Sequence, residues 1–205
     1  MNLYDKLTAK YPAKHFSIST TQTVIEEDAP EATTRSITIE HTGTEVLKMN
    51  KTLFVAMRDA AQTSSSTVIS PDVCDGAIAT ESMPFVGYVE LKSKCSQNEV
   101  IKARSQIIAS SSHMLTIAEN CALSLADIVQ KGIIVTQPIT DETLTKARQR
   151  RQRDDNLNVT FSSARFLLKL IEGEAKDDAT GISYVHVVAS KVVLLSELQR
   201  YPSNE

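Results

Sequence analysis

The stretch Phe85-Val86-Gly87-Tyr88-Val89-Glu90-Leu91-Lys92 decides how this chain is expected to fold. It begins as an apolar run with β-branched and aromatic residues, a composition typical of a buried strand. Side chains alternate along a strand, so Glu90 and Lys92 project from one face while Leu91 points to the other. A carboxylate and an ammonium at the end of a buried strand are costly to desolvate. The pair therefore marks a candidate functional site on a sheet.

A second predicted strand precedes this one and carries an acid. Residues 67–80 and 84–93 both have strand composition, and the short link between them predicts a hairpin. Asp75 lies in the first strand, where Ala77 and Ala79 continue its face. An aspartate arriving from this strand would supply a second oxygen ligand, beside Glu90, for a hard cation such as Mg²⁺.

A long helix and a further strand follow the hairpin. Residues 98–120 predict a helix, because Val100, Ile107 and Met114 repeat at an interval of seven and form one apolar stripe. Residues 131–136 predict a short buried strand. Because strands and helices are mixed along the chain, we expect an α/β fold with a central mixed sheet flanked by helices.

The segments before the hairpin have a weaker pattern. Residues 17–30 are rich in serine, threonine and acidic residues and predict a partly exposed strand with a loop, whereas residues 35–41 alternate as a half-buried strand does. Two readings of Thr42-Gly43-Thr44 stay open. It can turn the chain into a partner strand, or it can begin a helix that carries Leu47 and Phe54 into the core.

Residues after 138 predict two helices and one or two strands. They are a helix through residues 146–153 that Thr140 or Asp141 caps, a helix over residues 162–172 that Gly173 ends, and one or two strands within residues 182–195.

Composition bounds the class of protein. With 205 residues, 41% of them hydrophobic and 23% charged, the chain has the composition of one ordinary globular domain with a sizeable core. No apolar run is long enough to span a membrane, and the N-terminus lacks a signal-peptide pattern. The three cysteines, an odd number without a CxxC pair, predict reduced thiols in a cytoplasmic protein.

The set of Asp75 followed by Glu90-Leu91-Lys92 across a hairpin resembles the active-site pattern of the PD-(D/E)xK nuclease superfamily. The order of helix, hairpin, helix and strand over about residues 45–136 also resembles that superfamily's core. The resemblance implies a restriction-endonuclease-like sheet within a single nuclease-like domain spanning residues 1–205, with a C-terminal extension over about residues 140–205.

The resemblance also implies roles for these residues. Asp75 and Glu90 would hold Mg²⁺ or Mn²⁺, with the carbonyl of Leu91 as the third protein ligand. Lys92 would orient the attacking water or contact the scissile phosphate, and Gln106 falls where many members place a glutamine that helps to hold the site.

Two further acids are alternates within the same resemblance. Pro71-Asp72 supplies the letters of the family name, so Asp72 is the alternate to Asp75. Members often carry another acid on the helix before the hairpin, and Glu45, or otherwise Asp59, could fill that position.

Residues 146–153 form the one basic cluster of the sequence. Its five cations could contact nucleic-acid phosphates, although the net charge of the whole chain is −3 and a solvated helix face explains the same pattern. The cations are Lys146, Arg148, Arg150, Arg151 and Arg153.

These patterns lead to two hypotheses of different classes. The first is a metal-dependent nuclease that hydrolyses phosphodiester bonds, with DNA as its implied substrate and, by resemblance to many such nucleases, a homodimeric state. The alternative is a catalytically inactive nuclease-like module that binds nucleic acid or a partner protein. An unrelated α/β domain, in which Glu90 and Lys92 have no role, is the third reading.

Overall fold

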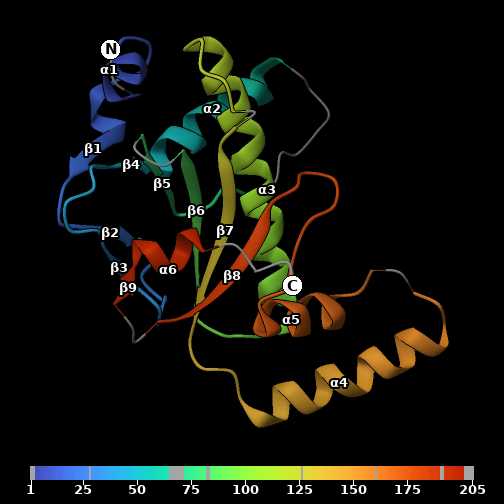
Figure 1. The fold of residues 1–205 in the computed structure, drawn as a ribbon. Helices are drawn as coiled ribbons and strands as arrows, with labels where there is room; N and C mark the ends of the chain where they lie inside the picture. Colours follow the sequence, from blue (N-terminus) through green and yellow to red (C-terminus); the bar gives the residue numbers. More distant parts are fainter. Residues whose placement is uncertain are drawn as a thin grey trace.

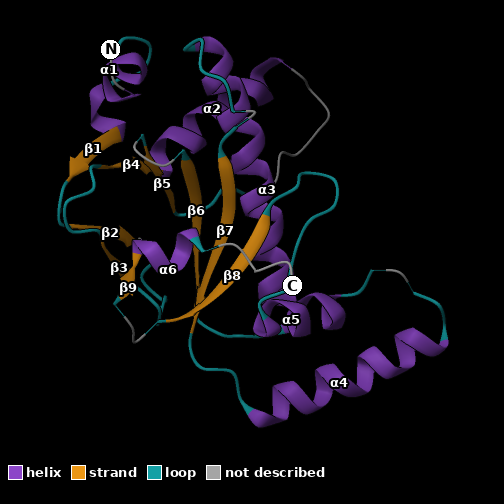
Figure 2. Ribbon diagram, viewed as in Figure 1, coloured by secondary structure: helices purple, strands orange, loops and turns teal. Residues whose placement is uncertain are grey.

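A six-stranded mixed sheet forms the centre of the molecule (Figures 1 and 2). The computed structural model describes residues 3–27, 29–64, 72–81, 84–125, 127–159, 161–189 and 192–200. In spatial order the strands are β1 (Phe16–Ser19), β4 (Val46–Asn50), β5 (Gly76–Thr80), β6 (Phe85–Lys92), β7 (Val129–Thr136) and β8 (Ser183–Val188). The predicted α/β class and the central mixed sheet are confirmed.

The strand pairing confirms the predicted hairpin. β5 and β6 are antiparallel, with Ala77 opposite Tyr88, whereas β6, β7 and β8 run parallel to one another. The first strand is shorter than the predicted span of residues 67–80, because β5 begins at Gly76 and residues 72–75 lead into it without strand structure. The predicted residues 67–71 lie outside the described part of the chain.

Helices cover one face of this sheet, and the longest of them lies along it (Figure 1). Their apolar faces join alternate strand residues such as Val86 and Tyr88 in one core. Among the described residues, no helix is both long and apolar enough to cross a membrane. The helices on this side are α1 (Leu3–Thr8), the 3₁₀ turn η1 (Ala13–His15), α2 (Lys51–Ser64), α3 (Gln97–Asn120), α4 (Asp141–Asn156) and α5 (Ser163–Glu172). One further helix, α6 (Leu195–Gln199), packs on the other face, where Leu195 and Leu198 join the second core.

A small second sheet covers the opposite face. It consists of β2 (Gln22–Glu26), β3 (Ser36–Glu40) and β9 (Val193–Leu194), and α6 follows it. Ile25, Ile39 and Val193 from this sheet pack with the other set of β6 side chains, such as Val89 and Leu91. Because β6 is buried on both faces, every one of its eight residues is buried.

The structure also resolves the open reading of residues 42–44. They turn the chain into β4, which contains Leu47, and the helix α2 begins only at Lys51, so the reading in which a helix begins at residues 42–44 is wrong. β4 does not pair with the preceding β3 but with β1 and β5. Glu45 therefore stands just before a strand and not on the helix where the resemblance had placed it.

The segment after residue 140 is integrated into the fold. Thr140 caps α4 through its side chain, and Gly173 ends α5 in the left-handed conformation, with φ of 78°, as predicted. The same segment contributes β8 to the main sheet and β9 to the small one. It is thus a structural part of both sheets.

Candidate metal centre

The hairpin register brings Asp75 and Glu90 together. Gly76 pairs with Val89, and the backbone N–H of Asp75 donates to the carbonyl of Val89 at 3.0 Å, which sets Asp75 opposite Glu90. Both residues are buried, Glu90 completely. The two carboxylates predicted to meet across neighbouring strands therefore do so.

The predicted alternation along β6 is also observed. Val86 and Tyr88 face the core that contains α3, and Leu91 faces the core beneath the small sheet. Glu90 and Lys92 share the parity of Val86 and Tyr88, so they project toward α3. Glu90 and Lys92 are at the C-terminal end of β6, beyond its apolar residues that pack against α3.

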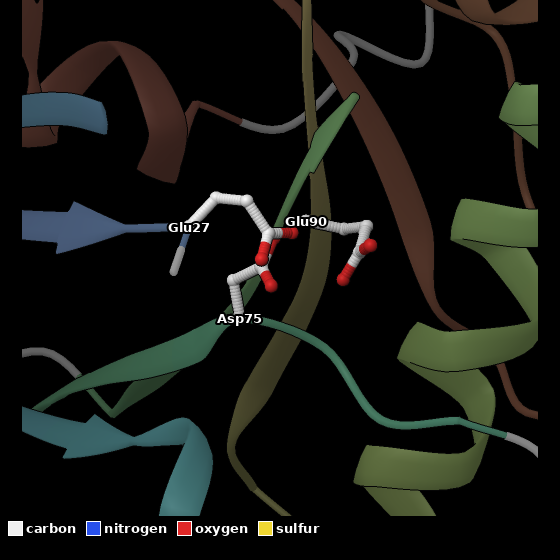
Figure 3. A group of neighbouring side chains, drawn as sticks. All are labelled: Glu27, Asp75 and Glu90. Carbon is white, nitrogen blue, oxygen red and sulfur yellow. The ribbon is translucent and has the colours of Figure 1, made fainter. Parts of the chain in front are cut away.

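A third carboxylate, which the motif does not contain, completes the cluster. Glu27 follows β2 of the small sheet and reaches the same end of β6 (Figure 3). One carboxylate oxygen from each of Glu27, Asp75 and Glu90 lies within 4.8 Å of the others. Three anionic oxygens this close in a buried site repel one another unless a cation lies among them.

One cation in this position is supplied by the chain itself. The Lys51 ammonium at the start of α2 lies 2.8 Å from Asp75 Oδ1 and 3.5 Å from Glu27 Oε1. The other Asp75 oxygen, Oδ2, accepts a hydrogen bond of 2.8 Å from the backbone N–H of Leu91. Both oxygens of Asp75 are therefore held, which fixes the carboxylate orientation.

Lys92 occupies the far side of Glu90 and is itself positioned by α3. Its ammonium lies 2.5 Å from Glu90 Oε1 and 2.7 Å from the Gln106 side-chain oxygen. The Gln106 amide donates at 3.2 Å to the carbonyl of Val73, in the segment that leads to Asp75. Gln106 thereby connects the lysine on β6 with the backbone before β5.

The same helix holds the Asp75 segment at a second point. Ser110, one turn beyond Gln106, accepts a hydrogen bond of 2.9 Å from the backbone N–H of Cys74. Gln106 and Ser110 are thus two polar side chains of α3 that are buried and bonded to the segment before β5. They are not a solvent face.

Burial changes the acidity of both strand carboxyls. It raises the pKa of Glu90 to about 8, an effect that Asp75 adds to and Lys92 opposes. It also raises the pKa of Asp75 to about 6, against the lowering effects of Lys51 and the Leu91 N–H. The pKa of Lys51 is raised, because the attraction of Asp75 and Glu27 outweighs its desolvation. Glu90 and Asp75 therefore keep their protons to a higher pH than free carboxyl groups do.

The donor set fits a divalent cation. Glu90 Oε2 is buried and has no hydrogen-bond partner within the described part of the chain, so one lone-pair-bearing oxygen is left unsatisfied in the cluster. Carboxylate oxygens are the ligands that Mg²⁺ and Mn²⁺ prefer. The side chains of Glu27, Asp75 and Glu90 could hold such an ion. Leu91, whose carbonyl the resemblance implies as a ligand, contributes its N–H to Asp75 here.

The alternate acids lie outside this cluster. Asp72 is more than half exposed and pairs with Arg58 at 3.3 Å, and Asp59 pairs with the same arginine at 3.0 Å. Glu45 is exposed just before Val46, which pairs with Thr80 at the end of β5 remote from Asp75. Asp75 is thus the aspartate that meets Glu90.

The five cations predicted to contact nucleic acid all lie on α4, which runs along the lower edge of the molecule in Figure 1. Ala147 is the one buried residue of that helix.

The three cysteines are free and buried, as the sequence predicted for reduced thiols, and burial raises the pKa of Cys74 to about 12. Cys74 is therefore unsuited to nucleophilic chemistry.

Sequence reasoning missed Glu27 and Lys51. Glu27 belongs to an acidic stretch directly after an alternating run. That stretch is the one feature of the sequence that could have indicated a functional role for Glu27. Lys51 lies between a strand and a helix without any motif. Their places depend on how the small sheet and α2 meet the hairpin.

Comparison of the chain with family models, with curated proteins and with solved structures returns no match. The functional argument therefore rests on the geometry of the site.

Proposed function

We propose that this protein is a metal-dependent phosphodiesterase of the nuclease type, with its centre at Glu27, Asp75, Glu90 and Lys92. One observation carries the proposal. Three carboxylates converge at the end of β6, with an unsatisfied buried oxygen on Glu90, and a lysine positioned by Gln106 lies beside them. The combination supplies both anionic ligands and a fixed cation, which phosphodiester hydrolysis needs.

Each group has a defined part in this proposal. A bound Mg²⁺ or Mn²⁺ would acidify water and neutralise charge on the phosphoryl oxygens. Glu27, Asp75 and Glu90 would bind the ion. Lys92 would orient the attacking water or contact the phosphate, and Gln106 would keep the lysine in place through its hydrogen bond.

The proposal extends to the substrate, the oligomeric state and the cellular compartment. The resemblance favours DNA, and the basic helix α4 supports a polyanionic substrate. The resemblance also favours a homodimer, with the segment after Thr136 as its interface. The free cysteines are the basis for expecting the reducing cytoplasm.

The test is cleavage of supercoiled and linear DNA with Mg²⁺ or Mn²⁺. Removing a ligand or the lysine, in Asp75→Asn, Glu90→Gln or Lys92→Met, should lower the nicking rate at least about 100-fold, because each acts on the transition state. Asp72→Asn is the matched control, since it neutralises a nearby exposed aspartate outside the cluster. Its rate should stay within twofold of the original protein. Cleavage that does not depend on Mg²⁺ or Mn²⁺, or that all three variants retain, would show that this cluster is not the active site.

A second function has an observation of its own. Lys51 already neutralises Asp75 and Glu27, as it would in a chain that binds nucleic acid or a partner protein without catalysis. Thermal denaturation with and without Mn²⁺ separates the two functions. A rise in Tm that Glu90→Gln abolishes supports the metal centre, whereas an unchanged Tm together with no cleavage supports the binding module.

A further inference from the structure

An open cavity of about 500 Å³ separates the start of α3 from α4. Its walls include Ser96 and Gln97 on one side and Lys146, Arg150 and Arg153 on the other. None of the residues that line it is acidic. The cavity therefore has a positive wall in a chain whose net charge is −3.

Helical periodicity divides the cations of α4 between two faces. Lys146, Arg150 and Arg153 are spaced by four and three residues, so they share the face that lines the cavity. Arg148 and Arg151 line a different surface between α4 and α5, together with Asp155 and Glu172. The basic cluster of the sequence is thus two patches of different net charge.

Ion pairing widens this difference. Arg151 lies 3.8 Å from Asp155, which neutralises it in part. In contrast, Arg150 and Arg153 have no carboxylate within 4.0 Å among the residues that the structure describes. Lys146 pairs with Glu142 at 2.5 Å, but both side chains are exposed, and such surface pairs exchange partners at little cost.

Side-chain contacts connect the elements that line the cavity. Arg150 donates at 3.5 Å to the side-chain oxygen of Gln97, which also accepts at 3.2 Å from Ser163 at the start of α5. Ser96 caps α3 by accepting from the N–H of Glu99. The two contacts of Gln97 link the start of α3 with α4 and α5 and place the Arg150 side chain at the cavity wall.

Both walls of the cavity begin at the end of the sheet where the carboxylates lie. Lys92 on β6 is the register partner of Thr136 on β7, and the two strands are parallel. α3 begins soon after Lys92, and α4 begins soon after Thr136. Ser96 is four positions after Lys92, so their Cα atoms are no more than about 15 Å apart. That span corresponds to about four base pairs of a duplex.

We propose that this cavity binds the backbone phosphates of a nucleic acid, on the same strand whose scissile phosphate lies at Lys92 and the carboxylates. The inference rests on the proposed function and deepens it, because it assigns a track for the substrate strand. The three cations extend over about 10 Å of α4. A row of phosphates matches this spread better than a single small anion does, since one anion would need the cations to converge on it.

Binding without catalysis tests the inference. Fluorescence anisotropy with a short labelled duplex, in EDTA and over a series of salt concentrations, compares the full chain with the double variant Arg150→Gln, Arg153→Gln. Loss of two phosphate contacts should make the negative slope of log affinity against log salt concentration shallower by about 1.8. It should also weaken binding about 60-fold at about 0.1 M salt. The variant Arg150→Lys, Arg153→Lys keeps the charge and should retain most of the affinity.

The matched control is Arg148→Gln, Arg151→Gln, which removes the same charge from the other face of the same helix. It should keep the original salt slope and affinity within about threefold. Equal weakening by both double variants would overturn the inference, as would an absence of binding by the original chain. Displacement of the duplex by pyrophosphate at an equal concentration of phosphate groups would also overturn it, in favour of a small-anion site.

The two proposals fail in distinguishable ways. If the protein binds DNA through this face of α4 but does not cleave it, the phosphate-binding proposal stands and the catalytic proposal is wrong. If the variant Arg150→Gln, Arg153→Gln cleaves DNA with an unchanged KM, the catalytic proposal stands and the phosphate-binding proposal is wrong. Circular dichroism of each variant confirms that the comparison is between folded proteins.

Discussion

Lys51 occupies two of the three carboxylates that would bind a metal ion. Its ammonium contacts Asp75 and Glu27 at the position where a bound ion would interact with the same oxygens. Two cations at such short separation repel each other strongly in a partly buried site. The lysine therefore stabilises the metal-free cluster and competes with a divalent ion for it.

The variant Lys51→Met should bind Mn²⁺ at least about tenfold more tightly than the original chain, because it removes this competing charge. Isothermal titration at a pH above 8, where Asp75 and Glu90 are ionised, measures the affinity directly. Lys48→Met is the control, since Lys48 and Lys51 line one open cavity beside Asp75, and Lys48 forms no ion pair within the described residues. Weaker binding by Lys51→Met would show that the lysine supports the ion.

Glu90 should make the metal-free protein less stable as the pH rises. Burial raises the pKa of Glu90 from 4.5 to about 8, so the folded state binds more protons than the unfolded state between these values. The stabilising effect of the protonated form is complete below pH 4.5 and is lost as the pH rises through 8. The direction is opposite to that of an ordinary salt-bridged carboxylate.

The neutral variant Glu90→Gln isolates this effect. In urea unfolding without metal, its free energy of unfolding should be close to that of the original chain near pH 5. Above pH 8 it should exceed the original value by on the order of a few kcal/mol. A difference between the two proteins that does not change with pH would contradict the raised pKa of Glu90.

At the scale of elements, the hairpin and α3 could be predicted because their signals are local. Alternation set the face of Glu90, and the interval of seven identified α3 within one residue of its observed start. The limits of β5 could not be predicted in the same way. Its strand composition continues upstream of Gly76, but within the described residues 72–80 the strand begins at Gly76, where β4 and β6 lie on either side.

Contact between β7 and β8 depends on one glycine. A Cβ built on Gly132 would lie 2.4 Å from the ring of Tyr184, its register partner on β8. That ring is fixed by an edge contact with Phe166 at 5.3 Å between centroids. There is no room for a methyl group unless the two strands separate.

Gly132→Ala should therefore lower the free energy of unfolding by about 1–3 kcal/mol or more, as overpacking of a rigid core does. Gly87→Ala is the comparison, because the nearest neighbour of its Cβ, at 2.8 Å, is the end of the flexible Ile133 side chain, and the Phe85 ring follows only at 3.1 Å. Urea denaturation of both variants should show the larger loss for Gly132→Ala. An equal loss would mean that the Tyr184 ring moves as easily as the isoleucine.

At the scale of the whole molecule, the site is built from segments that the sequence does not connect. The predicted group of Asp75, Glu90, Lys92 and Gln106 lies together because the hairpin and the following helix are neighbours in the chain. Glu27 joins from the small sheet on the other side of the main one. Its approach depends on packing between sheets, for which a single sequence has no local signal.

The pairing of β3 with β9 sets the order in which the chain can assemble. Ile39 and Val193 are partners in this short parallel ladder although they lie more than 150 positions apart. Contacts between such distant residues carry a loop-closure cost and tend to form slowly. The hairpin and α3 can form first, and docking of the small sheet would then deliver Glu27 as the last carboxylate. During refolding, uptake of Mn²⁺ should accordingly lag behind the recovery of helical signal, so that the ion reports the closing step of folding.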